Sequence, residues 1–124
     1  MKFILFCFTL IAACNPQVTE SAYNTSDLTR CWKYSYEDNE GDALAYRPCD
    51  YDFPPSRGRE GMTLRADNTF TYQAIAPTDG YRDLRGTWTL DDSTLTLQHT
   101  KPESRVEKFT LISLTAEKMQ LKKL

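Results

Sequence analysis

The stretch RGTWTLDDSTLTLQHT, residues 85–100, decides the fold because apolar and polar side chains alternate on both sides of an acidic pair. Successive side chains of a strand point to opposite faces, so an apolar residue at every second position marks the buried face. The expected inward side chains are Trp88, Leu90, Leu95 and Leu97. Asp91 and Asp92 interrupt the alternation with residues that favour turns. The stretch therefore predicts two antiparallel strands joined by a tight turn.

The same alternation extends in both directions along the chain. Trp32, Tyr34 and Tyr36 share one face of an expected early strand. The segment RADNTFTYQAIA, residues 65–76, predicts a turn followed by another strand. Its turn residues and inward side chains are Asp67, Asn68, Phe70, Tyr72 and Ala74. The segments VEKFTLISL and KMQLKKL predict a final hairpin around residues 115–117.

The predicted fold class is all-β, with about seven short strands. Short strands separated by tight turns favour an antiparallel meander, which forms a barrel or a sandwich. Residues 37–61 break this rhythm with prolines, glycines and charges of both signs. Connections of this length are uncommon and often functional, and order is expected in the half around Cys49. No segment has the pattern of a long amphipathic helix.

The N-terminus carries an apolar run, residues 3–13, directly after Lys2. The run is too short to cross a bilayer as a helix, which takes about 20 apolar residues. A charged start, a short apolar stretch and small residues at the exit are typical of a secretory signal. The prediction is a signal peptide over residues 1–13; the alternative is a buried strand or helix.

The exit Ile11-Ala12-Ala13-Cys14 resembles the lipobox of bacterial lipoproteins. This resemblance implies that the Cys14 thiol carries a diacylglycerol, that cleavage precedes it, and that its new amine is acylated. The membrane would then hold the protein through its lipid anchor. Asn15 is not the aspartate that retains some lipoproteins at the inner membrane, so the outer membrane of the cell envelope is favoured. The alternative for Cys14 is an ordinary signal with another cleavage site.

The expected organisation is a lipidated cysteine with a flexible tether over residues 14–27, followed by one β domain over residues 28–124. The tether segment is polar and has no periodicity. The chain has 15 Lys and Arg against 17 Asp and Glu, a net charge of −2. This balance argues against nucleic acid, which requires a basic face.

Two of the four cysteines remain once Cys7 leaves with the signal and Cys14 takes the lipid. An even pair in an exported protein predicts a disulfide between Cys31 and Cys49. A metal site is the alternative, but His99 is the single histidine and no CxxC motif is present. No metal and no cofactor are expected.

Several motifs together resemble the small lipocalin-like lipoproteins of bacteria, an uncharacterised group. They are DLTRCWKYSYE (27–37), LRADNTF (64–70), LRGTWTLDDSTLTL (84–97) and SLTAEKMQL (113–121). The resemblance implies a lipocalin-like barrel or half-barrel and export. Two departures stand out: Arg30 and Cys31 replace a usual glycine, and residues 46–62 form an insertion-like segment.

The candidate binding residues lie in or beside this segment and the turn near residue 80. They are Tyr46, Asp50, Tyr51, Phe53, Arg57, Arg59, Asp79 and Tyr81. Tyrosine and arginine are frequent in recognition surfaces, and a proline-rich loop would hold them at a barrel mouth. The alternative is internal: Arg57 pairs with Asp50 or Asp79, and the aromatic rings pack the loop against the barrel.

No catalytic site is expected, and the protein is predicted not to be an enzyme. The carboxylates Asp79 and Asp83 are explained by turn chemistry, and His99 is expected at the surface. Trp32 and Trp88 are interpreted as core residues, with the lining of an apolar pocket as the alternative.

The functional hypothesis is a monomeric, lipid-anchored binding protein of the cell envelope that takes a small apolar ligand or a protein partner. The alternative is an interaction or inhibitory module that recognises an envelope protein through the loop Cys49–Gly61.

Overall fold

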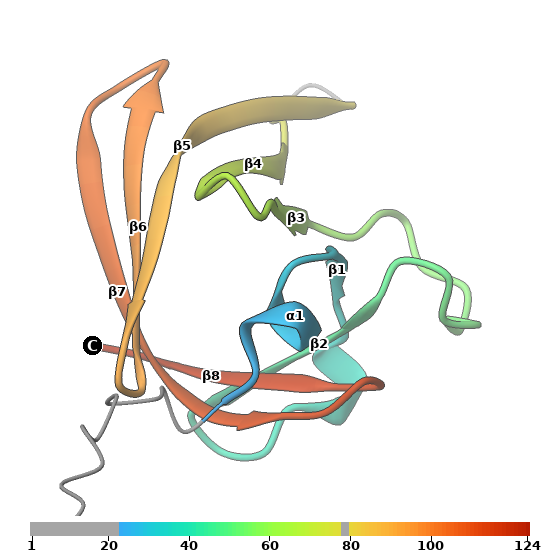
Figure 1. Ribbon diagram of the computed structural model, residues 1–124. Coiled ribbons are helices and arrows are strands. Elements are labelled where there is room, and N and C mark those ends of the chain that lie inside the picture. Colours follow the sequence, from blue (N-terminus) through green and yellow to red (C-terminus); the bar gives the residue numbers. More distant parts are fainter. Residues whose placement is uncertain (1–22, 78–79) are drawn as a thin grey trace, which may run out of the picture.

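The computed structural model describes residues 23–77 and 80–124, and in this part of the chain eight strands close into an antiparallel barrel (Figure 1). The strands are β1 (Cys31–Tyr34), β2 (Ala43–Pro48), β3 (Gly61–Leu64), β4 (Thr69–Ile75), β5 (Tyr81–Asp91), β6 (Thr94–Lys101), β7 (Arg105–Leu114) and β8 (Met119–Lys123). Two short helical segments accompany them, α1 (Thr25–Leu28) and the 3-10 turn η1 (Tyr36–Asp38). None of the helices described is long and apolar enough to span a membrane. The predicted signal peptide and Cys14 lie outside the described residues.

The strand order around the barrel is β1-β2-β8-β7-β6-β5-β4-β3. Strands β3 to β8 therefore form the expected meander, and the all-β antiparallel fold is confirmed. The first hairpin enters in inverted order, so that β1 lies between β2 and β3. Two strands were not named by the sequence analysis: β3, and β2, which lies inside the segment expected to be a loop.

The inverted hairpin explains the length of the connection between β2 and β3. Both strands are antiparallel to β1, so they are parallel to each other. Two parallel strands need a connection that returns along the full strand length. Residues 49–60 make this return outside the barrel and project from its side in Figure 1. The insertion-like segment is thus a crossover that the topology requires.

The predicted disulfide between Cys31 and Cys49 is confirmed, with the two α-carbons 5.4 Å apart. It links the first residue of β1 to the start of the crossover. The Cys49 amide also donates a hydrogen bond of 3.1 Å to the Cys31 carbonyl. The start of the crossover is therefore fixed to the barrel wall by a covalent bond and a main-chain bond.

One end of the barrel is filled by an apolar core beside α1 and is called the closed end here. Trp32 and Trp88 are buried, as expected of core residues. The Trp32 indole N–H donates to the Leu28 carbonyl at 2.9 Å, and the Trp88 indole N–H donates to the Arg65 carbonyl at 2.9 Å. The other large residues of the core are Leu28, Met62, Leu64, Phe70, Leu95, Leu97, Phe109, Leu111, Met119 and Leu121.

The structure differs from the expected tether over residues 23–27. The Tyr23 hydroxyl donates to the Leu111 carbonyl at 3.0 Å, and Asn24 caps α1 by accepting from the Ser26 amide at 3.1 Å. Leu28, at the end of α1, is fully buried. The segment has no strand periodicity because it forms a helical turn over the closed end of the barrel.

Two local predictions are wrong by a residue or two. Tyr36 does not continue β1 but begins η1, where its side chain is 48% exposed. The turn in the 85–100 stretch lies at Asp92 and Ser93, since Asp91 still pairs with Thr94. Asp92 takes a φ of 57°, a conformation that aspartate tolerates better than most residues and that tight hairpins require.

Strand β5 bends sharply in Figure 1, and its register against β6 shifts between Arg85 and Gly86. A β-carbon at Gly86 would lie 1.8 Å from the Gln98 carbonyl oxygen and 2.8 Å from the Phe70 ring. Only glycine allows the strands to approach this closely. The bend is what wraps the long strand around the barrel.

Candidate functional site

The inward faces of the strands change from apolar to polar along the barrel axis. The alternation that buries the core continues to the other end, called the open end here, where the β4–β5 and β6–β7 connections lie. The inward positions at the open end are occupied by Tyr34, Tyr46, Glu60, Tyr72, Arg82, His99, Lys101, Arg105, Glu107 and Lys123. The barrel therefore combines an apolar base with a polar cup.

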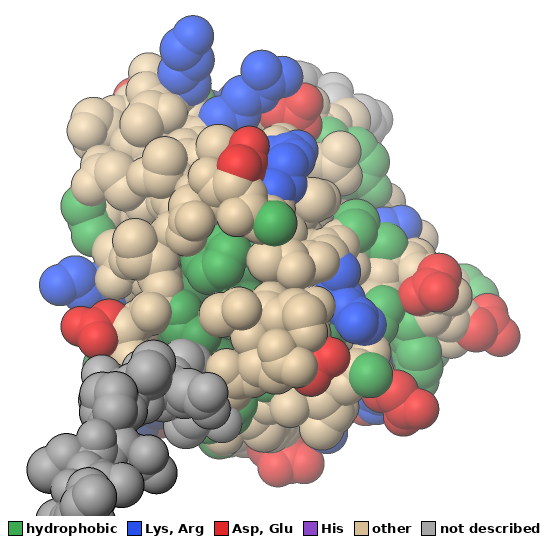
Figure 2. All heavy atoms as spheres, viewed as in Figure 1, with side chains coloured by type: hydrophobic (Ala, Val, Ile, Leu, Met, Phe, Trp, Pro, Cys, Tyr) green, Lys and Arg blue, Asp and Glu red, His purple; other side chains and the backbone are tan. Residues whose placement is uncertain are grey.

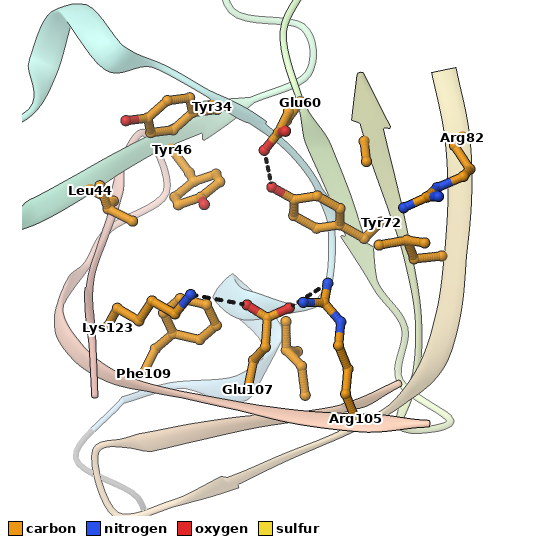
Figure 3. A pocket seen from close by; sticks show the side chains of 13 residues that line it. Tyr34, Leu44, Tyr46, Glu60, Tyr72, Arg82, Arg105, Glu107, Phe109 and Lys123 are labelled. Carbon is orange, nitrogen blue, oxygen red and sulfur yellow. Dashed lines mark hydrogen bonds and ion pairs between the residues drawn. The ribbon is translucent and has the colours of Figure 1, made fainter. Parts of the chain in front are cut away.

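A cavity of about 390 Å³ occupies this cup. Its apolar lining comes from Leu44, Leu84, Leu97 and Phe109, and polar side chains surround these residues (Figure 3). Cavities of a few hundred Å³ with an apolar lining and a small number of polar groups are typical of small-molecule sites. We take this cavity as the candidate site.

One wall of the cavity is formed by tyrosines. The rings of Tyr34 and Tyr46 lie 5.4 Å apart between centroids, and the Tyr34 hydroxyl accepts a hydrogen bond of 2.6 Å from the Asn39 amide. The Tyr72 hydroxyl donates to the Glu60 carboxylate (Figure 3). Burial, followed by nearby groups that include Glu60, raises the pKa of both Tyr46 and Tyr72. These phenols are therefore neutral at physiological pH.

Glu107 is the centre of the opposite wall, with its side chain 19% exposed. Arg105 approaches its carboxylate to 3.1 Å and Lys123 to 4.0 Å, and both point toward it in Figure 3. The His99 Nε2 atom lies 2.7 Å from the same carboxylate. Glu107 therefore has two cations and an imidazole beside it, and its charge is one of the causes that raise the pKa of Tyr46 and Tyr72.

The prediction of a surface His99 is wrong, since the residue is 2% exposed. His99 follows Leu95 and Leu97 at every second position of β6, so the alternation points its ring inward, edge-on to Phe70 at 5.1 Å. Neither ring nitrogen makes a hydrogen bond of good geometry within the described residues. A second hollow of about 190 Å³ lies beside the ring, between Arg82, Lys101 and Arg105.

Of the candidate residues that the structure describes, only Tyr46 lines the cavity. Tyr46 is not a loop residue but part of β2, where it is 4% exposed. Tyr81 begins β5 on its outward face and is 55% exposed. Asp50 and Arg57 are exposed, and Asp79 lies outside the described residues.

Within the described residues, the crossover is fastened to the rest of the barrel by Arg59. Arg59 is 9% exposed, forms an ion pair with Glu37, and donates 3.1 Å and 3.0 Å hydrogen bonds to the Tyr34 and Pro54 carbonyls. Its guanidinium also covers the Phe53 ring at 4.6 Å. The predicted pairing of Arg57 with Asp79 stays a prediction, since Asp79 lies outside the described residues.

A second ion pair supports the same region. Arg47 approaches Asp38 to 3.0 Å and lies over the Tyr51 ring at 4.7 Å, and Tyr51 meets Phe53 edge-on at 5.0 Å. Hydrogen bonds from Arg47 and then Ser35 lower the pKa of Asp38. The arginines of this cluster are thus engaged with acidic and aromatic side chains of the protein itself.

No group of three metal-binding side chains lies within residues 23–77 and 80–124. The cavity combines an apolar lining with charged side chains on its walls. The model of one protein family, described as a lipocalin-like domain, matches residues 17–121. Comparison with curated proteins and with solved structures finds no match.

Proposed function

Because the chain belongs to the family of lipocalin-like domains, we propose that it is a non-enzymatic binding protein that takes a small molecule into the open end of its barrel. The membership confirms the lipocalin-like part of the resemblance seen in the sequence. Members of this family are generally binding proteins. The observation that supports the proposal most is the cavity of about 390 Å³, because side chains from all around the barrel converge on it.

The composition of the cavity limits the ligand further. The closed end is filled by core side chains, among them Trp32, Phe70 and Trp88, whereas the cavity of about 390 Å³ lies in the cup. The cup pairs apolar residues with tyrosines and charged groups. We therefore propose a ligand with an apolar part and polar groups, rather than the wholly apolar ligand expected from the sequence.

The test fills the cavity without changing the outer surface. Ala74 lines the cavity from β4, and Gln73 lies next to it on the opposite, exposed face. We expect Ala74→Phe to lower the affinity for 1-anilinonaphthalene-8-sulfonate, a fluorescent probe of apolar sites, at least tenfold. It should also remove any ligand retained in native mass spectrometry of the full chain. The matched control Gln73→Phe should leave both signals unchanged, and equal effects of the two variants would refute the cavity as the site.

We also propose that the protein is exported and anchored by lipid to the cell envelope, at the outer membrane, through Cys14. The lipobox-like motif at residues 11–14 supports this, and so does the disulfide between Cys31 and Cys49, which suits an oxidising compartment. Cys14→Ser should release the protein from the membrane fraction, and it should also abolish acylation detected by mass spectrometry. Unchanged membrane association of the variant would contradict the anchor.

A second candidate function is recognition of an envelope protein through the loop Cys49–Gly61. It is favoured by two exposed rings, Tyr36 at 48% and Tyr51 at 41%, held in place by Arg59 and Arg47. Figure 2 shows acidic and hydrophobic side chains side by side on the projecting part of the molecule. A photo-crosslinking residue in place of Tyr51 should then yield one discrete protein adduct in intact cells. If no adduct forms, protein recognition is refuted and ligand binding is left as the function.

A further inference from the structure

Two opposite charges face each other across a gap at the rim of the cavity. Ala74 pairs with Arg82 in the β4–β5 ladder, and the β3–β4 register, continued by one residue from Gly61, places Glu60 opposite Ala74. The three residues thus form one inward row across three neighbouring strands. Strand spacing puts the α-carbons of Glu60 and Arg82 about 10 Å apart. The side chain between them is the single methyl group of Ala74, which lines the cavity.

Neither charge of this row is neutralised within the described residues. Glu60 accepts a hydrogen bond from the neutral Tyr72 hydroxyl, and the ion pairs of the barrel interior belong to Glu107. Arg82 makes no ion pair within residues 23–77 and 80–124. The contrast with Glu107 is informative, since the same cavity holds one satisfied carboxylate and one that lacks a cation.

The surroundings of Glu60 suit a positively charged group. Tyr34, Tyr46 and Tyr72 line the same side of the cavity (Figure 3). Aromatic rings attract ammonium groups through their electron-rich faces, and most strongly where water is excluded. A carboxylate beside three phenol rings therefore forms a site for an amine or a quaternary ammonium.

The surroundings of Arg82 suit an acid. Arg82 lines both the main cavity and the adjoining hollow of about 190 Å³, which it shares with Lys101 and Arg105. A guanidinium binds carboxylate and phosphate oxygens in pairs, with its planar fork. The hollow is thus a second, oppositely charged half of the same site.

Resting on the proposed binding function, we propose that the ligand is dipolar: its cationic group binds between Glu60 and the tyrosines, and its acid group binds at Arg82. Such a ligand supplies the missing partner of each charge at once. The class includes free zwitterionic solutes and zwitterionic lipid headgroups, which share this chemistry.

The test uses isothermal titration calorimetry of the full chain with phosphocholine, choline and inorganic phosphate. We expect phosphocholine to bind at least tenfold more tightly than either half. Glu60→Gln should reduce phosphocholine binding to the level of phosphate, and Arg82→Gln should reduce it to the level of choline. The controls Glu40→Gln and Arg85→Gln, both at exposed positions, should change nothing.

The outcomes separate this inference from the function on which it rests. Suppose that Ala74→Phe abolishes binding of the fluorescent probe, yet phosphocholine binds no better than choline or phosphate. The proposal of a dipolar ligand is then wrong, and the proposed binding function of the cavity stands. If no compound binds in an Ala74-dependent manner, both fail. With Cys14→Ser removing the proposed lipid anchor, co-sedimentation with phosphatidylcholine vesicles that is lost in Glu60→Gln and Arg82→Gln identifies a lipid headgroup. Binding of phosphocholine without co-sedimentation identifies a free solute.

Discussion

Replacement of Gly86 by alanine tests whether the bend in β5 is what permits the barrel to close. The added methyl carbon would lie 1.8 Å from the Gln98 carbonyl oxygen, 2.8 Å from the Gln98 carbonyl carbon and 2.8 Å from the Phe70 ring. Ordinary contacts begin near 3.4 Å, so β5 and β6 would have to separate by roughly 1.6 Å at this point. The obstacle is main chain, which cannot rotate away as a side chain tip can.

The cost follows from two terms. Overpacking of a well-packed interior destabilises by about 1–3 kcal/mol, and each ladder hydrogen bond lost with the separation adds about 1 kcal/mol. We therefore expect Gly86→Ala to lower the free energy of unfolding by about 3–4 kcal/mol. For a domain of this size that lowers Tm by roughly 15 °C or more. Urea unfolding, followed by tryptophan fluorescence, measures the free energy of unfolding. The signal changes on unfolding because Trp88 and Trp32 are both buried.

The control is Gly41→Ala. Gly41 has a φ of 56°, and no atom lies within 4 Å of the added carbon. Gly41→Ala therefore costs only the strain of a left-handed backbone, about 1–2 kcal/mol. The reasoning is refuted if Gly86→Ala costs no more than Gly41→Ala, because the close approach at Gly86 would then have no energetic weight.

Three further predictions concern the crossover and its supports. Reduction of the disulfide between Cys31 and Cys49 should lower the unfolding free energy by about 3 kcal/mol, as measured by the urea midpoint with and without reductant. Arg59→Met, which keeps the apolar stem, should speed proteolytic cleavage in the crossover while leaving the far-ultraviolet circular dichroism spectrum unchanged. The pKa of Asp38 is lowered by hydrogen bonds from Arg47 and Ser35, so its stabilisation is present above the unfolded pKa, near 4, and is lost as pH falls through the folded value. Asp38→Asn should therefore flatten the dependence of unfolding free energy on pH below 4, and a slope equal to that of the wild type would contradict the assignment.

The fold was predictable where one face of a strand is apolar throughout. In residues 85–100 every second residue is buried, as the alternation predicts, except Leu90 beside the turn, which is half-buried. Tertiary packing and local pattern agree there. Strand β2 was missed because the glycine at 41 and the proline at 48 dominate its short pattern. The inverted order of β1 and β2 leaves no mark on the pattern. The alternation shows which face of a strand is buried, and it does not show which strands lie beside it.

The candidate site was missed for a different reason. Inward positions were identified in the sequence by their apolar side chains. At the open end the inward positions recur at the same period of two, but they carry charged side chains. Arg82 precedes Leu84, Glu107 precedes Phe109, and His99 follows Leu97, each by two residues. Extending the alternation past the last apolar residue would have placed all three inside. What no pattern within one strand supplies is that Glu60 and Arg82 meet across Ala74, because this depends on the register between strands.

The crossover between β2 and β3 also bears on the order in which the chain folds. Each turn of the six-strand meander joins neighbours in sequence, so these pairings need only short loop closures. The β1–β2 hairpin, ringed by its own disulfide, is a second local unit. Joining them requires Leu44 to meet Leu121 and Trp32 to meet Met62. Contacts between residues distant in sequence form late. We therefore expect the barrel to close last, when the β1–β2 hairpin docks between β3 and β8.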